Sequence, residues 1–300
     1  MFDGIINVYK EPGFTSHDVV AKLRGILKQK KIGHTGTLDP DASGVLPVCL
    51  GSATKLCDML TDKSKEYRAV LLLGITTDTE DTSGQVTCTK DVCVDKDGLS
   101  SIIEGFVGEY DQIPPMYSAI KIDGKKLYEI ARAGKEVERK PRHVVIDGID
   151  DVIINLPRAE FTVRCSKGTY IRSLCRDIGE KAGCGGCMEK LVRTRVGQFH
   201  ISDSVSLSQI EQAVSEGTVD RYIVPVDSMF SEYPELVATG LAEKLVRNGN
   251  LFRRSDGLLC DGARVRVYIN DGETLKFAGI YEFDASSEAY RPVKMFLSGG

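Results

Sequence analysis

The densest group of chemically capable side chains lies in a short glycine-rich stretch near the start of the chain. His34, Asp39 and Ser43 crowd into residues 33–44, which also contain three glycines. Glycine lets the backbone approach a ligand closely, but an Asp before a Pro, as in Asp39-Pro40, is most often only a turn. The chain contains neither the phosphate-binding Gly-x-x-x-x-Gly-Lys pattern nor a His-Glu-x-x-His metal site. The stretch alone therefore does not identify a catalytic site, and the elements around it have to be considered as well.

Strands and helices are expected on both sides of this stretch. Apolar residues predict a strand over 5–8, and Thr15 or Ser16 can cap a helix whose apolar positions recur at helical spacing. The further expectations are a shaped loop at 33–47, strands at 67–73 and 161–165, and helices at 52–60, 99–106 and from residue 171 onward. Arg172 then falls at a strand-to-helix junction, where side chains often reach into clefts.

Length and charge indicate the kind of partner. Three hundred residues predict one large domain with a small appendage, and the net charge is −4. Residues 22–31 hold five Lys or Arg and no acid, and residues 121–142 hold eight Lys or Arg against four acids. A run of charge is usually a solvated face, but two basic islands flanking the candidate site favour a nucleic-acid partner. After residue 230, β-rich runs between Asp-Gly turns predict an all-β appendage of about 65 residues.

Cysteine usage and the N-terminus favour the cytoplasm. The nine cysteines are an odd number scattered along the chain, and the start Met1–Gly4 carries an early acid and no long apolar run. No window approaches the roughly 18 apolar residues that span a bilayer. Cys184 and Cys187 have the spacing of half a zinc site, but Cys88 and Cys93 are too far apart to form a second half. Reduced thiols and no metal are expected.

Seven motifs follow one another in order over roughly residues 4–200. They are Lys10 with Gly13-Phe14-Thr15-Ser16, the stretch from Gly33 to Pro47, Gly51-Ser52-Ala53-Thr54-Lys55, Lys65-Glu66-Tyr67-Arg68, Pro114 to Lys121, Gly168 to Leu174, and Leu191 to Gly197. Their order and spacing resemble the TruB family of tRNA pseudouridine synthases. The resemblance implies an α+β fold: a catalytic domain in residues 1–230, with a central mixed, mainly antiparallel sheet flanked by helices and loops. Residues 231–300 would form a small β-rich, PUA-like RNA-binding domain.

The resemblance also implies a catalytic set. Asp39 would be the essential carboxylate, Arg172 the guanidinium that aims it and keeps it ionised against the effect of burial, and Tyr67 the aromatic floor under a flipped base. Tyr67 could also accept the C5 proton, although a phenol with a pKa of about 10 is a poor base at neutral pH. Whether Asp39 first attacks C1′ or removes a proton from C2′ is left open.

Further matches concern RNA binding. His34 corresponds to a residue that takes the place of the flipped nucleotide, and Lys10, Lys55 and Tyr170 look like phosphate or pocket contacts. The segment from about 121 to 142, with Lys121, Lys125 and Lys126, corresponds to a mobile insertion that closes over the RNA arm.

The implied reaction converts uridine to pseudouridine at position 55 in the T-loop of tRNA. Reactant and product are isomers, so no redox cofactor, metal or nucleotide is expected. The implied partner is the tRNA T-arm, bound by a monomer that needs no protein partner. Two alternatives stay open: a tRNA-folding protein with incidental catalysis, and a guide-RNA-dependent synthase acting on ribosomal RNA. Relatives of the second kind usually carry basic tails, whereas this sequence ends in Ser298-Gly299-Gly300.

Overall fold

The computed structural model describes residues 1–122, 124–253 and 260–297, so the final Ser298-Gly299-Gly300 lies outside the described residues. A ten-stranded sheet forms most of the molecule. Its strands are β1 (Gly4–Lys10), β2 (Ile32–His34), β3 (Ser43–Leu50), β4 (Lys65–Leu73), β7 (Gly108–Gln112), β10 (Arg142–Asn155), β11 (Arg158–Cys165), β12 (Gly186–Val196), β13 (Phe199–His200) and β14 (Ile223–Val224).

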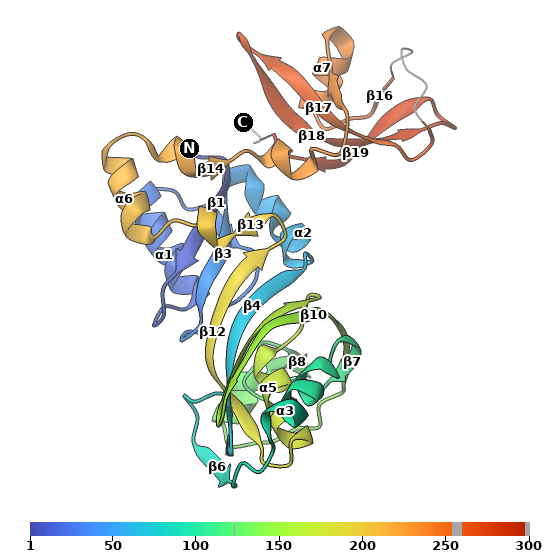
Figure 1. Ribbon diagram of the computed structural model, residues 1–300. Helices are drawn as coiled ribbons and strands as arrows, with labels where there is room; N and C mark the ends of the chain where they lie inside the picture. The colour runs from blue at the N-terminus through green and yellow to red at the C-terminus, as the bar shows by residue number, and fades with distance from the viewer. Residues whose placement is uncertain (123, 254–259, 298–300) are drawn as a thin grey trace.

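The strand order of this sheet is β14-β1-β3-β12-β4-β11-β10-β7, with β2 beside β3 and β13 beside β12 (Figure 1). Neighbouring strands are antiparallel except β3 and β12, which run parallel over a short stretch. The α+β class with a mixed, mainly antiparallel sheet is confirmed. The strand predicted at 67–73 is central, as β4, between β12 and β11.

Two apolar clusters hold the helices against this sheet. Helices α1 (Ser16–Leu27) and α6 (Leu207–Ser215) pack on β1 and β3, while α3 (Lys96–Glu104) and α5 (Ile171–Lys181) pack on β4, β10 and β11. The start of α1 is as predicted, because the Thr15 side chain accepts from the Asp18 N–H and the Asp18 carboxylate accepts from the Thr15 N–H.

Local predictions fail at two places before β4. Residues 33–47 are not all loop, since β2 and β3 take up both ends and only 35–42 remains irregular. Pro47 lies inside β3, where its carbonyl accepts from the Thr35 N–H at 3.2 Å. The helix expected at 52–60 is a 3₁₀ turn, Gly51–Leu56, followed by the short helix α2 (Cys57–Thr61).

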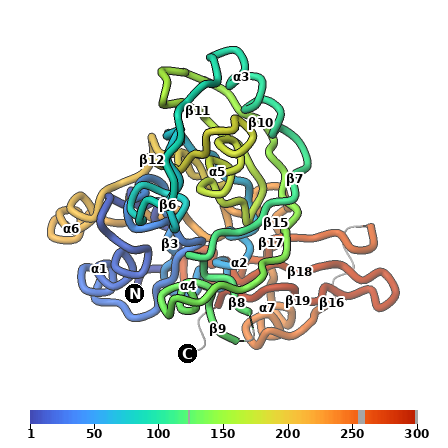
Figure 2. The backbone as a smooth tube through the Cα atoms, turned by 90° about the horizontal axis from the view of Figure 1, so that it is seen from below, coloured from blue at the N-terminus to red at the C-terminus, as the bar shows by residue number. Residues whose placement is uncertain are grey.

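Smaller elements connect the main ones. A hairpin of β5 (Ile75–Thr77) and β6 (Val86–Thr89) follows β4, and the basic segment contains β8 (Lys121–Ile122), β9 (Lys125–Lys126) and α4 (Leu127–Arg132). Three more 3₁₀ turns lie at Ile201–Asp203, Val219–Tyr222 and Val226–Phe230. Figure 2 shows α4, β8 and β9 side by side at one edge of the molecule.

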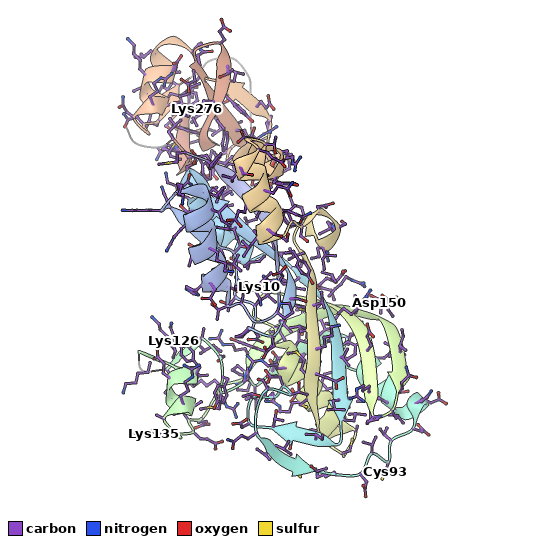
Figure 3. All side chains as sticks on the ribbon, turned by 90° about the vertical axis from the view of Figure 1, so that its left-hand side faces the viewer. Lys10, Cys93, Lys126, Lys135, Asp150 and Lys276 are labelled. Carbon is purple, nitrogen blue, oxygen red and sulfur yellow. The ribbon has the colours of Figure 1, made fainter. Side chains whose placement is uncertain are left out.

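A second sheet of five strands forms the C-terminal part. Its strands are β15 (Glu235–Val237), β16 (Phe252–Arg253), β17 (Arg264–Asp271), β18 (Thr274–Asp284) and β19 (Ala289–Met295). The all-β prediction is wrong in one respect, because helix α7 (Gly240–Arg247) packs on β16 and β17. The second sheet lies at one end of an elongated molecule (Figures 1 and 3). Among the described residues, no helix is long and apolar enough to cross a membrane.

Candidate active site

The loop 35–42 is held in place from several directions. The Ser16 hydroxyl accepts from the Leu38 N–H at 2.9 Å, which ties the start of α1 to the residue before Asp39. On the other side of Asp39, the Lys10 ammonium and the Gly13 N–H both donate to the Pro40 carbonyl, at 2.9 and 3.0 Å. The backbone flanking Asp39 is therefore fixed before any substrate binds.

Arg193 of β12 supports the same loop from beneath. Its buried guanidinium donates to the carbonyls of Val45, Thr37 and Gly36, at 2.8, 3.3 and 3.3 Å. It reaches them because β3 and β12 meet at Gly44, whose φ of +108° and whose closeness to the Arg193 backbone leave no room for a Cβ. Sequence reasoning gave Arg193 no role, although the residue lies in a motif of the resemblance.

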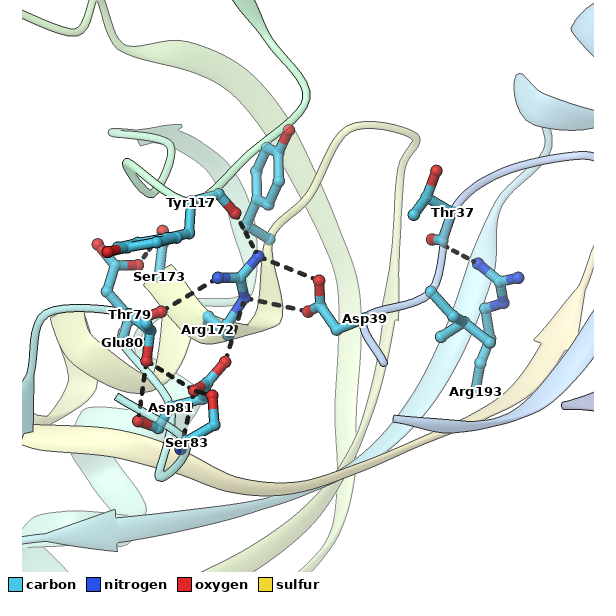
Figure 4. A network of polar contacts seen from close by, with 12 residues as sticks. Thr37, Asp39, Thr79, Glu80, Asp81, Ser83, Tyr117, Arg172, Ser173 and Arg193 are labelled. Atoms are coloured by element: carbon cyan, nitrogen blue, oxygen red, sulfur yellow. Dashed lines mark hydrogen bonds and ion pairs between the residues drawn. The ribbon is translucent and has the colours of Figure 1, made fainter. Parts of the chain in front are cut away.

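Arg172 and Asp39 form a two-point ion pair. The Asp39 Oδ2 lies 3.0 Å from Arg172 Nε, and Oδ1 accepts from Nη2 at 3.2 Å (Figure 4). The Arg172 side chain is 6% exposed and the Asp39 side chain 34%, so the carboxylate keeps an open side. Arg172 comes from the first turn of α5 and also donates to the carbonyls of Thr79 and Tyr117, at 3.1 and 2.9 Å. The planar Arg172 guanidinium, held by these bonds, therefore orients the Asp39 carboxylate.

The electrostatic expectation for Asp39 needs a correction. Burial raises the pKa of the Asp39 carboxyl above its ordinary value, and the opposing Arg172 charge does not restore it. Asp81 is a second cause, because its own carboxylate lies 3.9 Å from Arg172 Nε and repels the charge on Asp39. Arg172 therefore aims Asp39 but does not reverse the effect of burial.

Tyr67 lies close to this group, on β4. The side chain is buried, next to the Arg193 guanidinium. Burial raises the pKa of Tyr67 to about 12, which makes its hydroxyl a still weaker base at neutral pH than an ordinary phenol.

His34 and Tyr170 border the same region. The half-buried His34 ring meets exposed His17 edge-on with 5.2 Å between ring centroids, and burial lowers the pKa of His34. Tyr170 precedes α5, where its N–H and carbonyl are both bonded to the Gln112 side chain, at 2.7 and 3.0 Å. Burial raises the pKa of Tyr170.

Two lysines predicted as phosphate or pocket contacts bind backbone carbonyls instead. Lys10 is fully buried and donates to the carbonyls of Glu11, Phe14 and Pro40, so it braces the loop and offers nothing to a phosphate. Burial lowers the pKa of Lys10 to about 8. Lys55 donates to the Met295 carbonyl at 2.7 Å, which places it at the contact between the two sheets.

The basic segment stands off one side of the large sheet, as Lys126 and Lys135 show in Figure 3. Lys121 and Lys125 are exposed, and Lys126 is half-buried with its ammonium 5.4 Å from the Tyr128 ring centroid. Lys121 and Lys125 are thus accessible to a polyanion, whereas the Lys126 ammonium also donates to the Tyr128 hydroxyl at 3.4 Å. Within the described ranges, no group of three or more His, Cys, Asp or Glu side chains is arranged to hold a metal ion.

Comparisons with known proteins decide the family. Residues 24–171 match the family described as TruB family pseudouridylate synthase (N terminal domain), and residues 172–231 match the tRNA pseudouridylate synthase B C-terminal domain. The chain is 53% identical to the tRNA pseudouridine synthase B of Lachnoclostridium phytofermentans, over 98% of this chain and all of the relative. This chain belongs to the TruB family. It is therefore a pseudouridine synthase, an isomerase that modifies tRNA.

Other TruB relatives and solved structures agree. The tRNA pseudouridine synthase B of Bacillus subtilis is 40% identical over 99% of this chain and 98% of its own length. A structure of an H/ACA RNP bound to a substrate RNA containing 2′-deoxyuridine matches with a TM-score of 0.69 and 25% identity, over 98% of this chain and 85% of that one. A Cbf5-Nop10-Gar1 complex matches with a TM-score of 0.68 and 26% identity, with the same coverage. The fold shared with these two structures thus extends through both sheets.

Proposed function

We propose that this enzyme converts the uridine at position 55 in the T-loop of tRNA to pseudouridine, with Asp39 as the reacting carboxylate. The observation that carries the proposal is the two-point pairing of a partly exposed Asp39 with buried Arg172. The N1–C1′ bond breaks, the base turns, and C1′ joins C5; the C5 proton leaves and N1 gains one, so atoms balance without an oxidant. The sugar passes through an electron-poor state that a carboxylate stabilises, as in glycoside cleavage.

Two first steps fit this geometry. Asp39 either attacks C1′ or removes a proton from C2′. A tRNA carrying deuterium at C2′ distinguishes them, because only removal of that proton gives a primary isotope effect on the single-turnover rate.

The surrounding residues support a flipped base. We infer that Tyr67 forms the floor under the base, since base–aromatic stacking holds extruded nucleotides, and that His34 fills the gap left in the RNA. Lys121, Lys125 and Lys126 would hold the arm by its phosphates, and Tyr170 would line the pocket. The C-terminal sheet, in the 231–300 domain, would add contacts to the rest of the tRNA. Unpaired cysteines at all nine positions fit the reducing cytoplasm.

The test is Asp39→Asn, which keeps the size of the side chain and removes its charge. We expect no conversion at position 55, while the affinity for tRNA stays within about tenfold, since phosphate contacts supply most of the binding. Retained turnover would overturn the role of Asp39. If the inactive variant still helps tRNA to fold, the protein has a folding role in addition to its enzymatic one.

A second arm tests whether the chain acts alone. Purified enzyme should modify an isolated T-arm stem-loop as a monomer, without added RNA or protein. The alternative has support from the solved structures, of which one is an H/ACA RNP bound to a substrate RNA and the other a Cbf5-Nop10-Gar1 complex. If conversion required a guide RNA or a protein partner, the guide-dependent activity would replace the proposed one.

A further inference from the structure

One buried carboxylate behind Arg172 has no part in the reaction described above. Glu80 lies in the turn between β5 and β6, with its side chain 9% exposed. Its φ of +64° is left-handed, a conformation that costs energy in any residue with a side chain. Strained residues of this kind persist where the surroundings hold them and often serve a function.

Glu80 is bonded to the helix that carries Arg172. The Ser173 hydroxyl donates to Glu80 Oε2 at 2.6 Å, and Arg176 donates to Oε1. The residues flanking Glu80 contact Arg172 itself: the Thr79 carbonyl accepts from Nη1 at 3.1 Å, and the Asp81 carboxylate lies 3.9 Å from Nε. Figure 4 shows Glu80 on the side of Arg172 opposite Asp39. The contacts that hold Glu80 in place therefore also hold its neighbours Thr79 and Asp81 against Arg172.

The same carboxylate also contacts the basic segment and lies next to the chain that leads into it. At the far end, Arg139 Nη1 lies 4.0 Å from Glu80 Oε1 and donates to the Pro114 carbonyl at 2.9 Å. Before the segment begins, Arg176, already bonded to Glu80, donates to the Ile113 carbonyl at 3.2 Å. Arg139 near the end of the segment, and Ile113 and Pro114 ahead of it, are thus tied together around Glu80.

We propose that Glu80 is a positioning residue that locks the basic segment 121–142 to the Arg172–Asp39 pair. When the segment binds RNA, Arg139 and Glu80 transmit its position to the turn that contacts Arg172. Arg172 then sets the orientation of the Asp39 carboxylate. Tyr117, which lies just before the segment, provides a second link because its carbonyl accepts from Arg172. This inference rests on the proposed roles of Asp39 and of the basic segment.

The first test is Glu80→Gln, which keeps an acceptor for Ser173 and removes the charge. Arg176 retains Asp177 and Glu180 as partners, so the helix keeps its contacts. We expect the single-turnover rate at saturating tRNA to fall about 10- to 100-fold, since small displacements of reacting groups cost that much, while the Kd from filter binding changes little. The matched control is Glu180→Gln, a 64% exposed partner of the same arginine, which should keep the full rate.

The second test separates a lock from a phosphate-binding role at Arg139. Arg139→Gln should lose rate as Glu80→Gln does, and the double variant should be no slower than either single one. A lock leaves the salt dependence of binding unchanged, whereas removal of a phosphate-binding cation would lower its log–log slope by about one. Additive losses, a reduced slope, or a full rate in both single variants would overturn the proposal.

Asp39→Asn, measured alongside, distinguishes the two possible failures. Turnover in that variant removes the proposed function. An inactive Asp39→Asn with a fully active Glu80→Gln removes only the positioning role. If Glu80→Gln melts below the wild type and cannot be assayed, the partly exposed Arg139→Gln decides the question by the same rate and salt measurements.

Discussion

At the scale of single residues, burial and the neighbouring charges set the charge on Asp39. Burial and Asp81 raise its pKa, while Arg172 and, to a smaller extent, Lys10 lower it. The motif containing Asp39 and the motif containing Arg172 make the attractive pair predictable from the sequence. Neither the extent of burial nor the approach of Asp81 from the β5–β6 turn can be predicted in that way, because both depend on how distant segments pack.

This balance predicts the pH dependence of the reaction. An Asp39 that must be ionised gives an acid limb in kcat/KM, and a raised pKa places that limb above the ordinary range for aspartate. Asp81→Asn removes a repelling charge, lowers the pKa of Asp39, and should move the limb to lower pH. Asn keeps the Oδ1 that accepts from Thr79 and Ser83. The pH–rate profile of both enzymes checks this.

Asp78→Asn is the control, since Asp78 lies in the same turn and its carboxylate accepts from the Gln85 N–H at 2.7 Å. Its acid limb should coincide with that of the wild type. An Asp81→Asn limb that stays in place, or moves to higher pH, would contradict the assignment of the limb to Asp39.

At the scale of elements, the parallel contact of β3 with β12 carries the catalytic loop. It brings Arg193 under the carbonyls of Gly36 and Thr37, and it requires Gly44 at the point of closest approach. Gly44→Ala should destabilise the fold by more than about 3 kcal/mol, because a positive φ and a backbone collision add. Urea denaturation followed by far-UV circular dichroism measures the loss.

Gly13→Ala is matched to this change, with a φ of +83° but open space around an added Cβ. It should cost only about 1–2 kcal/mol, the cost of the left-handed backbone alone. Equal losses of stability in the two variants would show that glycine is needed at position 44 only for its backbone conformation, and not for the close approach of β3 and β12.

The basic segment gives a prediction at the same scale. Neutralising Lys125 and Lys126 together should lower the slope of log affinity against log salt concentration by about one for each phosphate that the two lysines bind. Lys90 and Lys96, both exposed near β6 and α3, serve as the control pair and should leave the slope unchanged. An unchanged slope in the Lys125 and Lys126 variant would mean that the segment is only a solvated face.

Periodicity predicted the elements that have one buried face, such as α1, β11 and α5, since alternation and helical spacing report burial directly. It failed where backbone partners decide the structure, as at Pro47 within β3 and in the 3₁₀ turn at Gly51. In the site, Asp39 and Arg172 could be paired from their motifs. The structural roles of Lys10 and Arg193 could not, because a buried cation bonded to carbonyls leaves no signature in its side-chain type.

At the scale of the whole molecule, the two sheets share an apolar core. Phe230, from the last 3₁₀ turn, contacts Phe277 of β18 and Phe296 just after β19, with ring centroids 6.3 and 6.0 Å apart. Ile280 of β18 belongs to the same cluster as Val45 and Leu56 from the large sheet and its 3₁₀ turn. The C-terminal sheet is thus docked by packing as well as connected by the chain.

This shared core predicts that the sheets unfold together. Phe296→Ala should cost about 3–5 kcal/mol, as truncations of buried phenylalanine do, and should shift the loss of both circular dichroism and catalytic activity to the same lower urea concentration. Tyrosine emission provides a third probe, since the chain has 11 Tyr and no Trp. Leu275→Ala, 53% exposed at the start of β18, should shift none of them. If Phe296→Ala instead lost its circular dichroism in separate steps, and lost activity at the same urea concentration as the wild type, the catalytic domain would be stable without the docked sheet.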